Sequence, residues 1–193
     1  MDWFFNFPDM SRSDLREFKK TVDFAFTDFS RTYGQAIEEF FEPLLMFLVW
    51  FEKLFINTPW PVIIFSILLL AWIGSRSILI VVGTFLSFML IGYFGMWEDT
   101  MSTLAIILVA TFLCIAIGIP LGIAMARSNK VQAAIVPVLD VMQTIPSFVY
   151  LIPVVMLLGI GKVPGLIAVC IYAIPPIVRL TNLGIRLVDK DVL

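Results

Sequence analysis

The stretch Asp140-Val-Met-Gln-Thr-Ile-Pro-Ser-Phe-Val-Tyr-Leu-Ile-Pro153 lies inside a long apolar region of the chain. A carboxylate, an amide, hydroxyl groups and two prolines interrupt what would otherwise be a plain membrane helix. Lipid offers no water to backbone groups freed by such a break, so the break persists only where protein or a water-filled path surrounds it. Polar groups at membrane depth are costly and mark a pathway or a helix contact. The stretch therefore predicts part of a transport device rather than a simple anchor.

The composition of the 193-residue chain is that of an integral membrane protein. Hydrophobic residues make up 60% of it, charged residues 15%, and the mean hydropathy is +0.99, whereas soluble domains are about 45–50% apolar. Histidine is absent, which removes histidine-based metal sites and the usual Ser-His and Cys-His nucleophile pairs. Cys114 and Cys170 fall in apolar spans and are interpreted as packing residues. We expect no catalytic residue, no metal site and no nucleic-acid partner, and a membrane-embedded enzyme is disfavoured.

Residues 1–57 predict a long amphipathic helix, because apolar side chains recur along them at spacings of three and four. These side chains are Phe18, Val22, Phe26, Phe29, Tyr33, Ile37, Phe40, Leu44 and Leu48. Ser11 or Ser13 is expected to cap the start of the helix, and Pro43 to kink or divide it. The run 44–51 is too short to cross a bilayer, which takes about 20 residues. We interpret the helix as lying on the membrane surface; the alternative is a helix packed on a partner subunit.

Five apolar segments follow, and the short loops between them predict antiparallel neighbours. The segments are 60–73, 78–96, 101–126, 131–160 and 163–180. The fourth would be about 45 Å long as one helix, against a hydrocarbon core of about 30 Å. We therefore predict a helix on the membrane surface up to Thr144, then a turn at Pro146 into the membrane, with Asp140 near the headgroups. In the fifth segment Pro175 and Pro176 predict an interruption.

Charges in the short loops predict the orientation in the membrane. If the segments alternate, one side carries Arg76, Arg127, Lys130, Arg186 and Lys190. The other side carries Glu98, Asp99, Lys162 and the amino-terminal tail. Lysine and arginine concentrate in cytoplasmic loops. We therefore expect the basic side and the carboxyl terminus in the cytoplasm, and the amino terminus outside.

Several long strings resemble a known family. Thr111-Phe-Leu-Cys-Ile-Ala-Ile-Gly-Ile-Pro-Leu-Gly122 resembles the opening core helix of ABC importer permeases of the type I fold. Residues 139–153, Gly159-Ile-Gly-Lys-Val-Pro-Gly-Leu-Ile-Ala168 and Ile171-Tyr-Ala-Ile-Pro-Pro-Ile-Val-Arg-Leu-Thr-Asn-Leu-Gly-Ile-Arg186 are similar to permeases for glycine betaine, proline betaine and choline. The resemblance covers about 60–193 and is dense from Thr100 onward.

This resemblance implies an all-α polytopic membrane protein with about five transmembrane helices. It assigns 1–57 to an extracytoplasmic amphipathic tail, 58–98 to two peripheral transmembrane helices, and 99–193 to three spans, one of them broken, of a type I ABC permease core. Family members continue past the position of Leu193 into a cytoplasmic Glu-Ala-type loop with a glycine, which docks onto the ATPase, and into two further spans. The sequence is therefore expected to be an incomplete permease core.

The family also implies a task and partners. A substrate-binding protein delivers a quaternary-ammonium osmolyte to the outer face, and a cytoplasmic ABC ATPase hydrolyses the ATP that drives transport. Two permease copies pair around one path in the bacterial cytoplasmic membrane, and the permease itself binds no cofactor. The alternative for this chain is a truncated, non-transporting membrane interaction protein.

The polar residues in the apolar segments can each be interpreted in two ways. The substrate-path candidates are Gln143, Thr144, Ser147, Tyr150, Tyr172 and Arg179. Alternatively, the amide and the two aliphatic hydroxyls cap backbone groups freed by Pro146, the tyrosines pack at interfaces, and the arginine snorkels to the headgroups. Candidates for helix breaks or hinges are Pro146, Pro153, Pro175 and Pro176.

Asp140 and Arg186 are candidates for the face toward the ATPase. For Asp140 the alternatives are a contact with a neighbouring helix or a solvated carboxylate near the headgroups. Gly118 and Gly122, four residues apart, predict a place where two helices approach closely.

Overall fold

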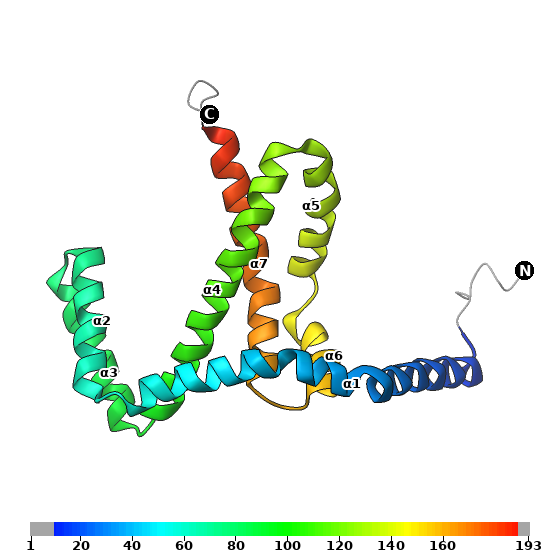
Figure 1. Cartoon of the computed structure of the whole chain (residues 1–193), viewed down its shortest axis with the longest axis horizontal. Coiled ribbons are helices and arrows are strands. Elements are labelled where there is room, and N and C mark those ends of the chain that lie inside the picture. The colour runs from blue at the N-terminus through cyan, green and yellow to red at the C-terminus, as the bar shows by residue number, and fades with distance from the viewer. Residues whose placement is uncertain (1–9, 189–193) are drawn as a thin grey trace, which may run out of the picture.

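The computed structural model describes residues 10–188, which form seven helices and no strand. The helices are α1 (Arg12–Asn57), α2 (Trp60–Ser75), α3 (Ile78–Tyr93), α4 (Trp97–Arg127), α5 (Asn129–Thr144), α6 (Ser147–Leu158) and α7 (Lys162–Leu187). Helices α4, α5 and α7 stand together as a core, α1 crosses one end of that core, and α2 and α3 form a hairpin beside it (Figure 1). The predicted all-helical class is confirmed.

Helix α1 is one uninterrupted helix of 46 residues. The Ser11 hydroxyl accepts a hydrogen bond from the backbone N–H of Asp14 at 3.2 Å, which confirms the predicted N-cap. Of the two alternatives for Pro43, division of the helix is wrong, because Pro43 lies inside α1, and a kink there stays a prediction. Proline removes the hydrogen bond to the carbonyl four residues earlier, and that residue, Glu39, is exposed, so water can replace the lost donor. The chain then turns by 100° between α1 and α2.

The hairpin of α2 and α3 is antiparallel, as the short loop predicts (Figure 1). Each helix has 16 residues, or about 24 Å at 1.5 Å per residue. Arg76 ends α2 in the left-handed conformation (φ 51°), and its N–H donates to the Trp72 carbonyl at 2.9 Å. The hairpin is thus a short pair of apolar helices joined to the core through the turn before α4.

Helices α4 and α7 pack along each other and are each long and apolar enough to cross a membrane. A Cβ on Gly118 would lie 2.8 Å from Ile177 Cγ2, and a Cβ on Gly122 would lie 2.5 Å from Thr181 Cβ. The predicted close approach is therefore confirmed. We refer to this contact between α4 and α7 at the two glycines as the glycine seam.

The prediction that Pro175 and Pro176 interrupt the fifth span is wrong, because both lie inside the continuous helix α7. Two successive prolines remove only the hydrogen bonds to the carbonyls of residues 171 and 172. Pro175 is buried, and the packing of α7 on α4 continues past the prolines to Val178 and Thr181. Tertiary packing therefore holds the helix together where the local sequence favours a break.

The fourth apolar segment is broken where the sequence predicts, between α5 and α6. The two helices meet at 89°, and Ile145 is extended (φ −80°, ψ 128°), as expected for a residue that precedes a proline. Pro153 lies inside α6 and does not end it. The break at Pro146 is thus confirmed, whereas Pro153 breaks nothing.

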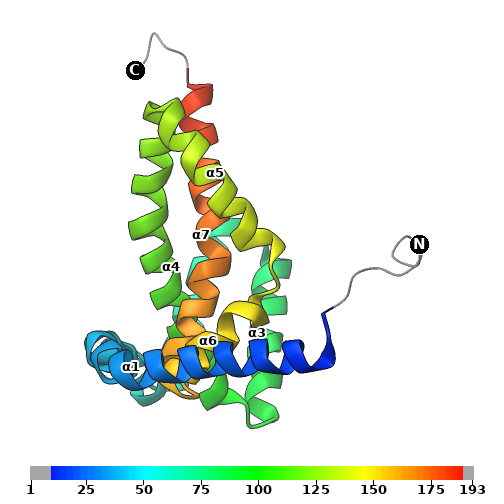
Figure 2. The same ribbon diagram turned by 90° about the vertical axis from the view of Figure 1, so that its right-hand side faces the viewer.

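The predicted position of α5 flat on the membrane surface is wrong. Helix α5 runs beside α4 and α7, and it is α6 that lies near α1 at the end of the core (Figures 1 and 2). The reason is an apolar cluster in which Leu139 of α5 packs with Met125 of α4 and Val178 of α7. Burying this face against the core outweighs a place at the interface.

The loop charges separate along the core as predicted. Arg76, Arg127 and Arg186 follow or end helices that run in one direction, and Lys130 lies at the start of the returning helix α5. Glu98, Asp99 and Lys162 begin helices at the opposite end (Figure 1). Lys190 lies outside the described residues. The sides are therefore distinct in charge, and their assignment to cytoplasm and exterior stays a prediction.

Candidate functional site

An ion pair joins α5 to α7 in the core. Arg179 Nη2 donates to Asp140 Oδ1. The two residues are sequence neighbours of Leu139 and Val178, which are buried together against α4. Because the apolar contact fixes the two helices side by side, the next side chain on each helix meets the other. The sequence-predicted path candidate Arg179 and ATPase-facing candidate Asp140 thus form one site, and Asp140 contacts a neighbouring helix.

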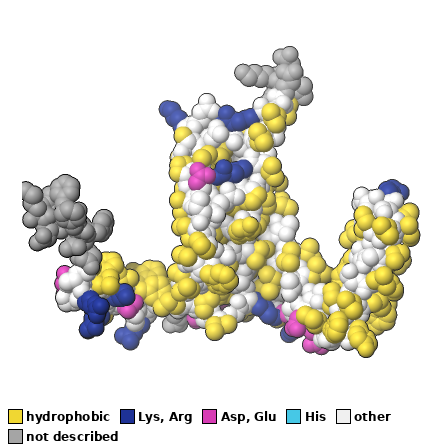
Figure 3. Space-filling model, turned by 180° about the vertical axis from the view of Figure 1, so that it is seen from behind, with side chains coloured by type: hydrophobic (Ala, Val, Ile, Leu, Met, Phe, Trp, Pro, Cys, Tyr) yellow, Lys and Arg dark blue, Asp and Glu magenta, His cyan; other side chains and the backbone are white. Residues whose placement is uncertain are grey.

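The pair lies within the length of α7 rather than at its end. Arg179 precedes the last residue of α7, Leu187, by eight residues, or about 12 Å at 1.5 Å per residue. An acidic and a basic side chain touch on a flank of the core that is otherwise hydrophobic or uncharged (Figure 3). The side chains of Arg179 and Asp140 remain 39% and 55% exposed. Charged groups at such depth face protein or water rather than lipid.

Arg179 retains unused hydrogen-bonding capacity. A guanidinium has five N–H donors, and here one nitrogen donates to one carboxylate oxygen. Among residues 10–188, Arg179 Nε is the buried side-chain nitrogen that has no hydrogen-bond partner. The site therefore offers a planar donor group that a further acceptor would satisfy.

Two other path candidates share the Asp140 side of α5. Gln143 and Thr144 follow Asp140 by three and four residues, which places them on the same helix face, and both are exposed. Thr144 Oγ1 donates to the Val141 carbonyl at 3.3 Å, which also accepts from the Ile145 N–H and is therefore not a group freed by Pro146; its path and capping roles both stay predictions. Tyr172 precedes Arg179 by seven residues, or about two turns, and so lies on the same face of α7; 67% of it is exposed.

Tyr150 and Ser147 lie at the break instead. The Tyr150 hydroxyl is within hydrogen-bond distance of the carbonyls of Val141 (2.9 Å) and Met142 (3.0 Å), so it satisfies the end of α5 from α6. Ser147 is the exposed first residue of α6. The Tyr150 hydroxyl thus serves the fold of the break, a role that the sequence does not predict.

Arg186 holds the corner between α4 and α5 against α7. Its guanidinium donates to the Met125 carbonyl at 2.9 Å, to Asn129 Oδ1 at 2.8 Å and to Asn182 Oδ1 at 3.0 Å. An arginine on the last carbonyls of a helix also matches the negative end of the helix dipole. The predicted role of Arg186 toward an ATPase remains a prediction.

Sequence reasoning missed Glu52, which is buried at the other end of the core. Its carboxylate accepts hydrogen bonds from Ser102 of α4 and from Lys162 of α7. The hydrogen bond from Lys162, then that from Ser102, lowers the pKa of Glu52. Glu52 follows Leu48 by four residues and therefore lies on the apolar stripe of α1. A charged residue on that stripe is the sequence signal that points to Glu52.

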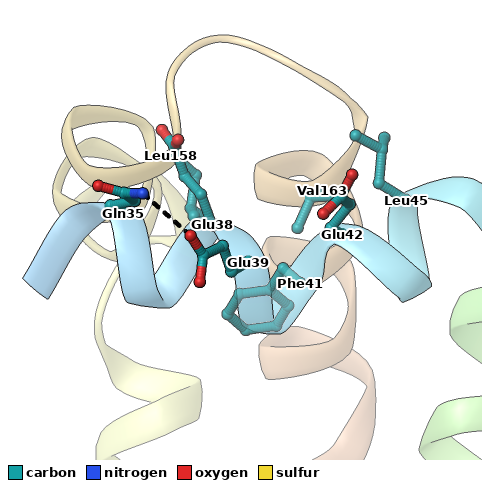
Figure 4. Close-up of a pocket in the computed structure, with 8 residues that line it drawn as sticks. All are labelled: Gln35, Glu38, Glu39, Phe41, Glu42, Leu45, Leu158 and Val163. Carbon is teal, nitrogen blue, oxygen red and sulfur yellow. Dashed lines mark hydrogen bonds between the residues drawn. The ribbon is translucent and has the colours of Figure 1, made fainter.

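A hollow of about 450 Å³ lies between α1 and the turn that joins α6 to α7 (Figure 4). It is lined by Gln35, Glu38, Glu39, Phe41, Glu42, Leu45, Leu158 and Val163. Gln35 Nε2 donates to Glu39 Oε1 at 3.0 Å. Its three carboxylates make this end of the core acidic, as do Glu98 and Asp99.

Comparison with known families decides the class of protein. Residues 118–193 match the family of binding-protein-dependent transport system inner membrane components. These residues belong to that permease family. The matched range contains both Asp140 and Arg179, the helices α5, α6 and α7 that place them, and the α4 half of the glycine seam.

Curated relatives of this permease are transport proteins rather than enzymes. The glycine betaine/proline betaine transport system permease protein ProW of Escherichia coli is 48% identical over 143 residues, which cover 74% of this chain and 40% of that relative. The glycine betaine/carnitine transport permease protein GbuB of Listeria monocytogenes is 43% identical over 69% of this chain and 48% of its own length. The glycine betaine transport system permease protein OpuAB of Bacillus subtilis is 40% identical over the same two shares. The chain thus spans less than half the length of these relatives.

Proposed function

We propose that this permease is the membrane-spanning subunit of an ABC importer for a quaternary-ammonium osmolyte: glycine betaine, choline or proline betaine. The observation that carries the proposal is the half-exposed Asp140–Arg179 pair, which lies inside the permease segment and within the length of the long apolar helix α7. A charged flank of this kind faces a water-filled path or a second protein surface rather than lipid. Similarity to permeases named for glycine betaine supports the substrate class.

In this proposal the permease sits in the bacterial cytoplasmic membrane, with its amino terminus outside and its carboxyl terminus in the cytoplasm. The positive-inside rule supports the orientation, since Arg127, Lys130 and Arg186 gather at one end of the core. A cytoplasmic ATPase docks at that end and hydrolyses the ATP, so the permease itself holds no cofactor. A substrate-binding protein delivers the osmolyte at the opposite, acidic end.

Helix α1 lies on the outer membrane surface in this arrangement. Its support is the course of α1 across the end of the core (Figure 1) and the apolar side chains that it leaves exposed, such as Phe18, Val22 and Phe40. A second permease copy completes the path. The charged flank of α5 and α7 then faces that path, and the apolar sides of the hairpin face lipid.

Uptake in cells tests the proposal. The complete product of this gene is produced with its ATPase and its binding protein in bacteria that lack their own osmolyte importers, and entry of labelled glycine betaine and choline is measured. We expect uptake of at least one of them only when all three components are present. Uptake that needs neither the ATPase nor the binding protein contradicts the proposal. Binding of the binding protein without any uptake would instead favour a non-transporting interaction protein.

A further inference from the structure

We propose that Asp140 and Arg179 form an exchange site for a zwitterion: the carboxylate of the osmolyte binds the Arg179 guanidinium while its quaternary ammonium lies against the Asp140 carboxylate. This inference rests on the proposed transport function. It adds a site on the permease itself and a preference for osmolytes that carry both charges.

The first argument is charge balance. Opening an ion pair away from bulk water normally leaves two uncompensated charges, which is strongly unfavourable. A zwitterion brings one charge of each sign, so each member of the pair exchanges one partner for another and no charge is left alone. A cation without a carboxylate compensates Asp140 and leaves Arg179 unpaired. The same pair therefore admits a betaine more readily than choline.

The second argument is the geometry of Arg179. The edge of a guanidinium formed by Nε and one terminal nitrogen matches a carboxylate in a bidentate contact. In Arg179 the Nε is buried and has no partner, and Asp140 takes one bond from Nη2 on the same edge, so a carboxylate reaches this edge when the guanidinium turns away from Asp140, as the exchange requires. A carboxylate on that edge would satisfy a donor that the ion pair leaves unmet. Unmet buried donors are costly, so this position favours an incoming acceptor.

The third argument is access, and Glu52 provides the contrast. Both oxygens of Glu52 are occupied, by Ser102 and Lys162, and the residue is 7% exposed. Asp140 uses one oxygen and its side chain is 55% exposed. Lys162 and Arg179 are about equally exposed, so the difference lies in the carboxylates: Asp140 is the one that a small solute can reach.

The surroundings suit a quaternary ammonium as well. Tyr172 lies on the Arg179 face of α7, two turns toward the acidic end, and most of it is exposed. An aromatic face attracts a cation that lacks N–H donors. Tyr172 therefore stands between the acidic end and the ion pair, where an ammonium group would pass before it reaches Asp140.

The test uses the complete permease in complex with its ATPase, in lipid nanodiscs and without the binding protein. Thermal unfolding is followed during titration with glycine betaine, with tetramethylammonium chloride and with sodium acetate, the last two being the separate halves of the zwitterion. The variants are D140N and R179Q, with R179K as a conservative form that keeps the positive charge and the helix contact. E52Q is the matched control, since it disrupts the other ion pair to α7.

We expect the apparent affinity for glycine betaine to fall about tenfold or more in D140N and R179Q. R179Q should lose the response to acetate and keep that to tetramethylammonium, and D140N should show the reverse. R179K should fold as the wild type does. It should bind glycine betaine more weakly, because the lysine ammonium lacks the planar pair of N–H donors with which a guanidinium binds a carboxylate. E52Q should bind all three solutes as the wild type does.

Wild-type binding in the D140N and R179Q variants would overturn the inference. An equal loss of the responses to acetate and to tetramethylammonium in each variant would also overturn it, because a pair with only a structural role would give that result. Uptake by the wild-type importer separates the two proposals. If quaternary ammonium compounds are imported while the variants bind normally, the exchange site alone is wrong; if none is imported by the assembled wild-type importer, the transport function fails.

Discussion

Two ion pairs tie other helices to α7, and they differ in how completely they are satisfied. At the acidic end, Glu52 of α1 is buried and both of its oxygens accept hydrogen bonds, from Ser102 and from Lys162. Nearer the other end of α7, Asp140 and Arg179 stay half-exposed, and the buried Nε of Arg179 has no partner. The carboxylate of the first pair has no free oxygen, whereas the second pair has donors and an oxygen left for another group.

The difference shows how an ion pair that only holds helices together can be distinguished from one that can bind a ligand, although both consist of a carboxylate and a cation. A buried carboxylate with both oxygens filled gains nothing from a ligand, and removing its partner leaves a charge that is hard to solvate. An exposed carboxylate with a free oxygen, beside a guanidinium with spare donors, is more responsive to solutes. Variants can test this contrast, beginning with the frame on which both pairs depend.

The glycine seam should give the largest effect. In Gly122→Leu the new side chain would start 2.5 Å from Thr181 Cβ and 2.9 Å from the Val178 carbonyl oxygen, which is backbone and cannot swing away. Helix α7 must then move off α4, at a cost of about 3 kcal/mol in the free energy of unfolding. Arg179, next to Val178, would lose its position against Asp140. Thermal unfolding in nanodiscs and a cysteine-crosslinking distance between α4 and α7 measure both effects.

Gly83→Leu is the matched control, since a Cβ on Gly83 of α3 meets nothing within 4 Å. Its unfolding temperature should stay near that of the wild type. Equal losses in the two variants would mean that the seam is not the tight contact described.

Glu52→Gln should give the second-largest effect, because it removes the ion pair between Glu52 and Lys162 that attaches α1 to the core. The substitution keeps the shape and removes the charge that Lys162 faces, so we expect a loss of about 1–2 kcal/mol in the attachment of α1 to the core. Hydrogen exchange in α1 after residue 44 should speed up, while exchange in α5 stays unchanged. Glu42→Gln, on an exposed glutamate of the same helix, should leave the exchange rates as they are. Faster exchange in α5 as well would mean that the two pairs are not independent.

Acidic pH should weaken the same attachment of α1 to the core. Hydrogen bonds from Lys162 and Ser102 lower the pKa of Glu52 from the ordinary value of 4.5, so the carboxylate form stabilises the fold above that value. This stabilisation declines as the pH falls below 4.5 through the lower pKa of the folded state. Proteolysis of α1 measured from neutral pH downward should therefore increase in that acidic range. In Glu52→Gln the additional acid step should be missing, and an unchanged step in the variant would assign it to another group.

Much of the frame could be predicted from the sequence because it depends on local patterns. The three- and four-residue spacing predicts α1, Ser11 predicts its cap, and Pro146 predicts the break between α5 and α6. Gly118 and Gly122 predict a close contact, although not its partner, α7. Each of these features requires only a few neighbouring residues.

Most failures have one cause, which is packing between distant segments. Pro175 and Pro176 predict a break locally, yet packing on α4 keeps them inside a continuous helix; at Pro43 the exposed backbone allows the helix to continue. The position of α5 against the core follows from Leu139 meeting Val178, residues that sequence alone does not pair. For the same reason the sequence alone neither joins Asp140 to Arg179 nor indicates the partners of Glu52.

The smallest effect should come from Tyr150→Phe, which distinguishes a residue of the fold from a residue of the path. The variant loses the hydroxyl that reaches the Val141 and Met142 carbonyls, and one such hydrogen bond is worth about 1 kcal/mol. Hydrogen exchange across residues 141–150 should speed up because the corner between α5 and α6 loosens. Tyr172→Phe is the control: its exposed ring remains, so exchange should not change. If Tyr150→Phe instead leaves exchange unaltered and weakens glycine betaine binding, Tyr150 belongs with Asp140 and Arg179, and the boundary drawn between the broken corner and the ion-pair site is misplaced.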